Sequence, residues 1–253
     1  MTTDQIIETL DRAKADLSHH PQSTVRLLYP FTLWLAKIGL KHRVNPNFLT
    51  LCMFLTVLVA LPFFCFSNAV CAIVGLLLIQ WFEIFDDADG IVARGTGQLS
   101  VYGEQLDYLM HLFCHPLSLI VYAFAVWRTL PSEKMLDFLP LSNAVLLTVL
   151  CSIFAVSEYG MRAVIELDAI TRLKRLQKND TPDSEPMHGF RALIGMNLLC
   201  YPVFMQLFPV FLVIDAFAST HISFWIYGGF ACLWLLFYLK HSAGRLLRFM
   251  RRA

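Results

Sequence analysis

The sequence has few charged residues for its length. Asp, Glu, Lys and Arg make up 15% of the 253 residues, whereas a soluble globular domain contains roughly 25%. Hydrophobic residues make up 57% of the chain and the mean hydropathy is +0.58. The polar surface is therefore too small to cover a soluble particle of this size. This composition argues against a disordered chain and against a nucleic-acid-binding protein.

Cysteine motifs and a cleaved leader are also missing. None of the seven cysteines belongs to a C-x-x-C pair or to a Cys/His ligand spacing, so we interpret them as small hydrophobic residues. Residues 1–20 are polar and lack the basic-then-apolar pattern of a signal peptide. We therefore expect internal segments to direct insertion into a membrane.

Long apolar runs are what the sequence has instead. A transmembrane helix needs roughly 20 mostly apolar residues, and six runs of about that length lie between polar breaks. They cover approximately residues 47–67, 69–93, 103–130, 141–164, 190–216 and 221–244. The breaks between them contain Pro and Asp/Asn clusters, which interrupt helices. The pattern predicts an all-α integral membrane protein with six transmembrane helices.

The basic residues are distributed unevenly over the loops that these six spans define. If the spans alternate in direction, all of the 20 Lys and Arg residues except Arg128 and Lys134 lie on one side. Cytoplasmic loops carry the excess of Lys and Arg in membrane proteins. We therefore expect both termini in the cytoplasm, in a protein of the cytoplasmic membrane of a bacterium.

Residues 23–42 precede the first predicted span. Pro30, Arg26 and Lys37 interrupt the segment, and its mixture of Leu, Phe, Trp and basic residues favours a helix in the cytoplasmic interface. A seventh span is the alternative, but it would move the N-terminus outside and remove the charge asymmetry. We expect a polar N-terminal segment, residues 1–22, followed by a single membrane domain, residues 23–253.

Carboxylates at the end of the second span are the first candidate functional group. Charged groups in a membrane helix cost several kcal/mol unless they are paired, hydrated or metal-bound. Successive residues of a helix are rotated by 100°, so several small and charged residues at the end of this span fall on one face, within an arc of roughly 140°. The residues on this face are Asp86, Asp89, Gly90, Ala93 and Arg94. Glu83 lies near its edge, and Asp87 projects to the flank.

A second polar stripe begins the third span. Gly103, Asp107 and His111 recur at i, i+4 and i+8, and a loop of about eight residues would fold this helix antiparallel to the second span. Several converging carboxylates stay ionised only if cations neutralise them. Hard oxygen ligands near the cytoplasmic surface favour Mg²⁺ or Mn²⁺. The alternative is a solvated helix end, which we consider for Asp87 and Glu104.

The spacing of these residues resembles the signature of the CDP-alcohol phosphotransferase (CDP-alcohol phosphatidyltransferase) family, D-x₂-D-G-x₂-A-R-x₈-G-x₃-D-x₃-D. Seven of its eight fixed positions match, with every spacing preserved, between Asp86 and His111. The segment VNPNFLT at 44–50 is similar to the family's T-P-N-x-L-T segment, and Ser100 stands where the family often has Thr or Ser. The likeness extends over roughly residues 24–245.

The resemblance implies a homodimeric six-helix enzyme that transfers a substituted phosphate from a CDP-alcohol, commonly CDP-diacylglycerol, to an acceptor alcohol and releases CMP. It implies that Asp86, Asp89 and Asp107 hold divalent metal at the pyrophosphate. The fourth acid of the family acts as general base or metal ligand. The residues implied to surround the CDP group are Asn47, Thr50, Gly90, Ala93, Arg94, Ser100 and Gly103.

His111 is the position that departs from the signature. Neutral imidazole can accept a proton from the attacking hydroxyl and can also bind a metal through one nitrogen, so we assign His111 to both the catalytic and the metal-binding set with Asp107. The change also removes one negative charge, which weakens the site for a second cation. In the alternatives, Glu104, Asp87, a group behind the site or a water on the metal takes the proton.

Two further alternatives stay open at this stage. The chain is either an active transferase or a paralogue that binds a nucleotide lipid without turnover. A cation transporter is a rival class, although the acids gather at the ends of two helices and the other spans carry almost no ionisable groups to continue a pathway. Glu158, one turn from Arg162 in the fourth span, either lines an acceptor cavity or pairs with that arginine.

Overall fold

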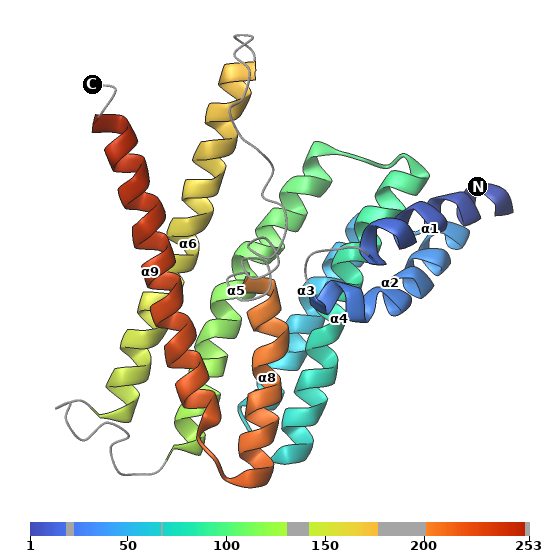
Figure 1. Cartoon of the computed structure of the whole chain (residues 1–253). Helices are drawn as coiled ribbons and strands as arrows, with labels where there is room; N and C mark the ends of the chain where they lie inside the picture. The colour runs from blue at the N-terminus through green and yellow to red at the C-terminus, as the bar shows by residue number, and fades with distance from the viewer. Residues whose placement is uncertain (19–22, 67, 131–141, 177–200, 251–253) are drawn as a thin grey trace.

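The computed structural model describes residues 1–18, 23–66, 68–130, 142–176 and 201–250, and the described residues form helices joined by turns, without a strand. Figure 1 shows their arrangement. The helices are α1 (Thr3–Ser18), α2 (Ser23–His42), α3 (Pro46–Phe64), α4 (Ala69–Thr96), α5 (Val101–Thr129), α6 (Asn143–Leu176), α8 (Tyr201–Ala218) and α9 (Ile222–Met250).

Five of these helices contain a segment long and apolar enough to cross a membrane. These segments are Pro46–Phe64, Ala69–Thr96, Val101–Thr129, Asn143–Gly160 and Ile222–Gly244. They confirm the predicted first, second, third, fourth and sixth spans, with ends shifted by a few residues. The structure shows an all-helical protein with the length and composition of an integral membrane protein.

The predicted fifth span, 190–216, is described only in its second half. The described apolar helix here is Val203–Ala218, and residues 190–200 lie outside the described residues. The Pro-containing stretch 131–140 and the charged stretch 177–189 lie outside them as well. Upstream, α6 continues past the predicted end of the fourth span at 164 to Leu176, because charged residues end an apolar run without ending a helix.

The consecutive pairs α3–α4, α4–α5 and α8–α9 run antiparallel, whereas α6 and α9, which pack against each other, run in the same direction (Figure 1). The turns that join α2 to α3 and α4 to α5 lie at the same end of the bundle at which α9 ends, and the α8–α9 turn lies at the opposite end. At 1.5 Å per residue, α4 and α5 with 28 and 29 residues are each roughly 40 Å long. They exceed the hydrocarbon thickness of about 30 Å.

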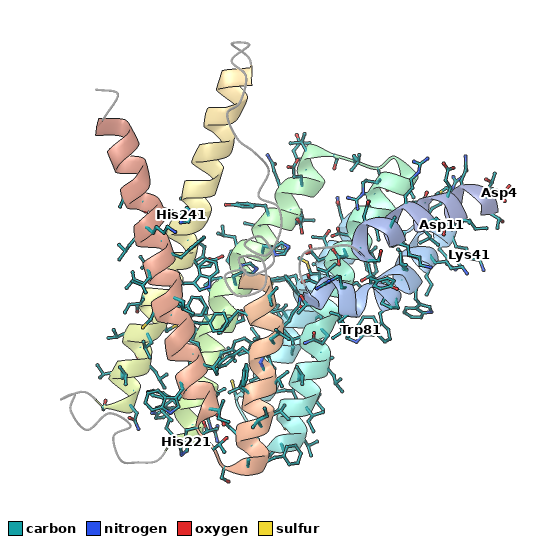
Figure 2. The ribbon with its side chains drawn as sticks, viewed as in Figure 1. Asp4, Asp11, Lys41, Trp81, His221 and His241 are labelled. Carbon is teal, nitrogen blue, oxygen red and sulfur yellow. The ribbon has the colours of Figure 1, made fainter. Side chains whose placement is uncertain are left out.

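Aromatic rings fill the main core between α5, α6, α8 and α9. Phe154 of α6 and Phe204 of α8 have ring centroids 4.8 Å apart, and Tyr227 of α9 contacts both rings. Figure 2 shows side chains filling the space between these helices. These large buried rings contribute both hydrophobic burial and edge-to-face contacts. They therefore stabilise the packing of α5, α6, α8 and α9 against one another.

A second, smaller core joins α1 and α2 to α4. Ala13 and Leu17 of α1 are buried in it with Leu40 of α2 and Val92 of α4. Asp4 and Asp11 of α1 and Lys41 of α2, labelled in Figure 2, lie on this part of the molecule. Residues 3–18 of the predicted polar N-terminal segment therefore form a helix that packs on α2 and α4.

One face of α2 is apolar and exposed. The side chains on this face recur at i, i+4, i+7 and i+11, which is one side of a helix. They are Leu27, Phe31, Trp34 and Ile38, which are between 38% and 72% exposed. The helix that the sequence predicts over residues 23–42 is present, and this face is its unpartnered side within the described part of the chain.

Candidate active site

A helical hairpin of α4 and α5 builds the site. The backbone of α4 ends at Gly97, whose φ of 70° lies in the left-handed region that glycine adopts without strain. Ser100 then caps α5, its hydroxyl oxygen accepting a hydrogen bond from the Gly103 amide at 3.0 Å. This turn places the end of α4 beside the start of α5, and with them the two polar stripes of the sequence.

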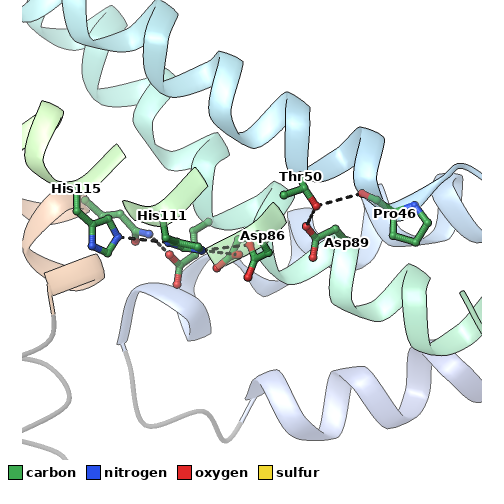
Figure 3. Close-up of polar contacts among 9 residues, drawn as sticks. Pro46, Thr50, Asp86, Asp89, His111 and His115 are labelled. Atoms are coloured by element: carbon green, nitrogen blue, oxygen red, sulfur yellow. Dashed lines mark hydrogen bonds and ion pairs between the residues drawn. The ribbon is translucent and has the colours of Figure 1, made fainter. Parts of the chain in front are cut away.

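Asp86, Asp107 and His111 meet between the two helices. His111 Nε2 lies 3.1 Å from an Asp86 carboxylate oxygen and 3.4 Å from Asp107 Oδ1. One ligand atom from each of the three residues lies within 4.8 Å of the others. Figure 3 shows His111 pointing toward Asp86. The two carboxylates suit Mg²⁺ or Mn²⁺, and the imidazole can add one nitrogen ligand to a divalent cation.

One oxygen of this cluster supports the fit of a cation. Asp107 Oδ1 is buried and has no hydrogen bond within the described residues, and its contact with His111 is 3.4 Å long. A buried carboxylate oxygen normally accepts at least one hydrogen bond or binds an ion. The residues of the cluster therefore fit a bound metal ion.

Asp89 lies one turn further along α4 and faces α3. Its carboxylate accepts a hydrogen bond of 2.5 Å from the Thr50 hydroxyl, and Figure 3 shows this hydroxyl between Asp89 and the Pro46 carbonyl. Thr50 is held by the start of α3, where Asn45 caps the helix and Pro46 occupies its first turn. Asp89 is thus near the cluster of Asp86, Asp107 and His111 but does not belong to it.

A cleft of about 560 Å³ opens next to these acids. All seven residues expected around the CDP group line it, and Asp89 and Asp107 line it too. The lining residues are Pro46, Asn47, Thr50, Asp89, Gly90, Ala93, Arg94, Gln98, Leu99, Ser100, Val101, Gly103, Glu104 and Asp107. Three helices therefore bring most of the motif residues to one cavity. Asp86 and His111 are not among its lining residues, and Asp107 belongs both to the cavity and to the Asp86–Asp107–His111 cluster.

Two glycines keep the cleft open. A Cβ on Gly103 would lie 3.0 Å from Asn47 Oδ1 and 3.1 Å from Ser100 Oγ. A Cβ on Gly90 would lie 3.1 Å from a guanidinium nitrogen of Arg94, whose side chain folds back over this glycine. A larger residue at either position would displace a polar side chain of the cleft.

A layer of buried polar residues lies behind the cluster. The sequence pointed to Glu83 and Glu158 but not to His115 and Gln206. His115 of α5 contacts His111 and Glu158, and Gln206 of α8 donates a hydrogen bond to Glu83 of α4. These four residues are each at most 4% exposed. His115 continues the spacing of Gly103, Asp107 and His111 by one more step of four residues. This spacing could have placed His115 on the same face of the helix from the sequence alone. No sequence pattern indicated a role for Gln206.

The two residues considered as solvated helix ends differ from one another. Glu104 is exposed and lines the cleft. Asp87 is not a lining residue, and one of its carboxylate oxygens is buried without a hydrogen bond in the described part of the chain. Of the two, Glu104 is the one next to the cavity. The Arg162 side chain lies outside the described residues, so its predicted pairing with Glu158 stays a prediction.

A comparison with protein families agrees with the motif. The family model described as CDP-alcohol phosphatidyltransferase matches residues 43–181. This range begins two residues before Asn45, the cap of α3, contains the whole α4–α5 hairpin and extends through α6. A search of curated proteins found no match to the chain.

Proposed function

This chain belongs to the CDP-alcohol phosphatidyltransferase family, and on that premise we propose that it transfers a substituted phosphate from CDP-diacylglycerol to an acceptor alcohol. The acceptor oxygen attacks the phosphorus that carries the diacylglycerol group. The bond from this phosphorus to the bridging oxygen of CMP breaks, and CMP leaves with that oxygen. The hydroxyl proton of the acceptor passes to a base.

The observation that carries the proposal is the shared position of Asp107. Asp107 lines the cleft of about 560 Å³ and also lies 3.4 Å from His111 in the cation-binding cluster. A nucleotide in the cleft would therefore have its pyrophosphate next to the acids. Phosphoryl transfer depends on this combination of positioning and charge neutralisation.

The cleft offers the groups that a CDP moiety requires. Arg94 provides a guanidinium for phosphate oxygens, and Asn47 and Ser100 provide neutral hydrogen-bonding groups for the nucleoside. Gly90 and Gly103 let the ligand approach the backbone of α4 and α5 closely. We propose these residues, with Thr50 and Ala93, as the donor-binding set.

We propose Asp86, Asp89, Asp107 and His111 as the ligands of Mg²⁺ or Mn²⁺. The cation would neutralise the pyrophosphate charge and stabilise the charge that develops on the leaving phosphate. Asp107 and His111 are also the groups that combine ligand character with the capacity to accept a proton, so we propose that the acceptor hydroxyl is deprotonated at one of them.

The membrane placement is part of the same proposal. We propose six spans, with α8 as the described part of the fifth, and both termini on the cytoplasmic side, where the basic residues gather. The exposed apolar face of α2 would lie in the interface, with Arg26 and Lys37 of the same helix near anionic headgroups. We also propose a homodimer, on the resemblance to the family.

The test is CMP release in proteoliposomes that receive CDP-diacylglycerol, a panel of acceptor alcohols and Mg²⁺ or Mn²⁺. Mass spectrometry of the lipid product identifies the acceptor. We expect CMP release that requires both the acceptor and the cation, and a fall of about 100-fold or more in Asp107→Asn. Asp11→Asn makes the same chemical change on the exposed side of α1 and serves as the matched control. Lack of CMP release across the panel would overturn the proposal.

A further inference from the structure

A buried chain of ring nitrogens connects His111 to α6. His111 Nδ1, on the side of the ring away from Asp86, lies 3.3 Å from His115 Nε2. His115 Nδ1 lies 3.3 Å from a Glu158 carboxylate oxygen. His115 and Glu158 are each 1% exposed, and Figure 3 shows the contact between the two histidine rings. The chain starts at the cation-binding cluster and ends at a carboxylate on another helix.

The order of donors and acceptors along this chain fixes one tautomer of each ring. A carboxylate accepts hydrogen bonds, so the His115 Nδ1–H donates to Glu158. A neutral imidazole has only one N–H, so His115 Nε2 then accepts, and the donor to it is the Nδ1–H of His111. The Nε2 of His111 is left with its lone pair, and this nitrogen faces Asp86 and Asp107.

A contact between α5 and α6 fixes the position of Glu158 relative to His115. Pro116 has no N–H to donate to the Leu112 carbonyl four residues before it. The Tyr159 hydroxyl donates to this carbonyl at 2.8 Å. Because Tyr159 follows Glu158 directly, the same contact between the helices sets the height of Glu158 beside His115.

We propose that Glu158, acting through His115, is a positioning residue that presents the Nε2 lone pair of His111 as a ligand to the divalent cation. Metal-binding histidines generally donate their other ring N–H to a carboxylate or carbonyl, and loss of that partner weakens metal binding by about 10–100-fold. Here a second histidine stands between the ligand and the carboxylate. The inference rests on the proposed function only for the location of the cation.

The test measures Mn²⁺ binding by electron paramagnetic resonance on the full chain in nanodiscs, without donor or acceptor. Electron spin echo modulation reports a ¹⁴N nucleus directly bound to Mn²⁺. We expect this signal in the unchanged protein and its loss in His111→Asp, which retains a possible oxygen ligand. In Glu158→Gln we expect the Mn²⁺ affinity to fall about 10-fold, because an amide presents N–H and C=O alike and no longer selects one tautomer.

A second variant and a control keep the test independent of folding. His115→Leu removes the link and is expected to weaken both the affinity and the ¹⁴N signal. Ser157→Ala changes the residue before Glu158, whose hydroxyl bonds only to Ile153 of its own helix among the contacts described, and should leave both unchanged. Absence of Mn²⁺ binding, absence of the ¹⁴N signal, or an unchanged affinity in Glu158→Gln would each overturn the inference.

The two proposals fail separately in these experiments. If the protein binds Mn²⁺ with the ¹⁴N signal and Glu158→Gln weakens the binding, but no CMP is released, the positioning role is supported and the proposed reaction is overturned. CMP release with unaltered Mn²⁺ binding in Glu158→Gln would retain the reaction and remove the positioning role.

Discussion

The hydroxyl of Tyr122 on α5 donates a hydrogen bond of 2.8 Å to the Met205 carbonyl on α8. This carbonyl is four residues before Pro209, which has no N–H to donate to it. The relationship repeats the one between Tyr159 and the carbonyl that Pro116 leaves without its helical donor. In both places a tyrosine of a neighbouring helix satisfies a backbone group that cannot bond to water inside a bilayer.

The first prediction concerns this substitute donor. Tyr122→Phe keeps the ring, which is 0% exposed, and removes only the hydroxyl. The Met205 carbonyl is then buried without a donor, so we expect a loss of about 1–3 kcal/mol of stability and a lower unfolding temperature in detergent. Tyr102→Phe is the matched control because Tyr102 is 81% exposed. Equal unfolding temperatures for both variants would contradict the role of the hydroxyl.

The second prediction concerns the chemistry of His111. We expect His111→Ala to lower the rate of CMP release by about 100-fold or more, since it removes both a metal ligand and a possible base. His111→Asp restores the acid found in the family signature and should recover part of the rate. The measurement is CMP release at saturating donor and acceptor. An alanine variant as fast as the unchanged protein would exclude His111 from the reaction.

The third prediction concerns the shape of the cleft. In Gly103→Ala the new Cβ would press on the side chains of Asn47 and Ser100. We expect the KM for the CDP-alcohol to rise about tenfold, equivalent to about 1.4 kcal/mol, with a smaller change in kcat. Gly229→Ala on α9 adds the same methyl group where, apart from the adjoining residues and backbone of its own helix, no described atom lies within 4 Å. A similar KM in both variants would show that Gly103 does not shape the donor site.

The fourth prediction concerns the α8–α9 turn at the other end of the bundle. Asp215 accepts hydrogen bonds from the Thr220 hydroxyl at 2.6 Å, from the Ile222 and Ser223 amides at 2.9 and 3.0 Å, and from the Ser223 hydroxyl. It therefore caps α9 from the end of α8.

Asp215→Ala removes every one of these acceptors, so we expect a loss of about 2 kcal/mol of stability. Asp215→Asn keeps one oxygen and should lose less. CMP release at a temperature well below unfolding should stay within about twofold, because the turn lies away from the cleft. A large loss of activity in a folded Asp215→Asn protein would place this turn in the catalytic cycle.

Much of the candidate site could be predicted because its residues are close in sequence. The spacing of Asp86, Asp107 and His111 follows from two helices joined by a short turn, so periodicity alone brings their faces together. The spans were equally accessible, since apolar length is a local property. The continuation of α6 as a helix beyond residue 164 could not be predicted in this way, because a solvated helix and a loop have similar composition.

The contacts behind the cluster could not be predicted in the same way. Glu158 is 43 residues from His115, and its position depends on how α6 packs against α5. The sequence offered Arg162 as a partner at one helical turn, and no local pattern pointed to a histidine on another helix. The Glu83–Gln206 contact joins α4 to α8 over 123 residues. Such pairs are set by the tertiary packing of the bundle.

The turn at Gly97 has a consequence for how the protein is made. Asp86, Asp107 and His111 all belong to one hairpin, which is complete when the ribosome has added Thr129 at the end of α5. Glu158 comes later, so the nascent hairpin contains the acids and His111 before their buried support exists. The contact between His115 and Glu158 behind His111 can form only after α6 has been synthesised and lies beside α5. Docking of α6 is thus the step that would complete the proposed support of His111.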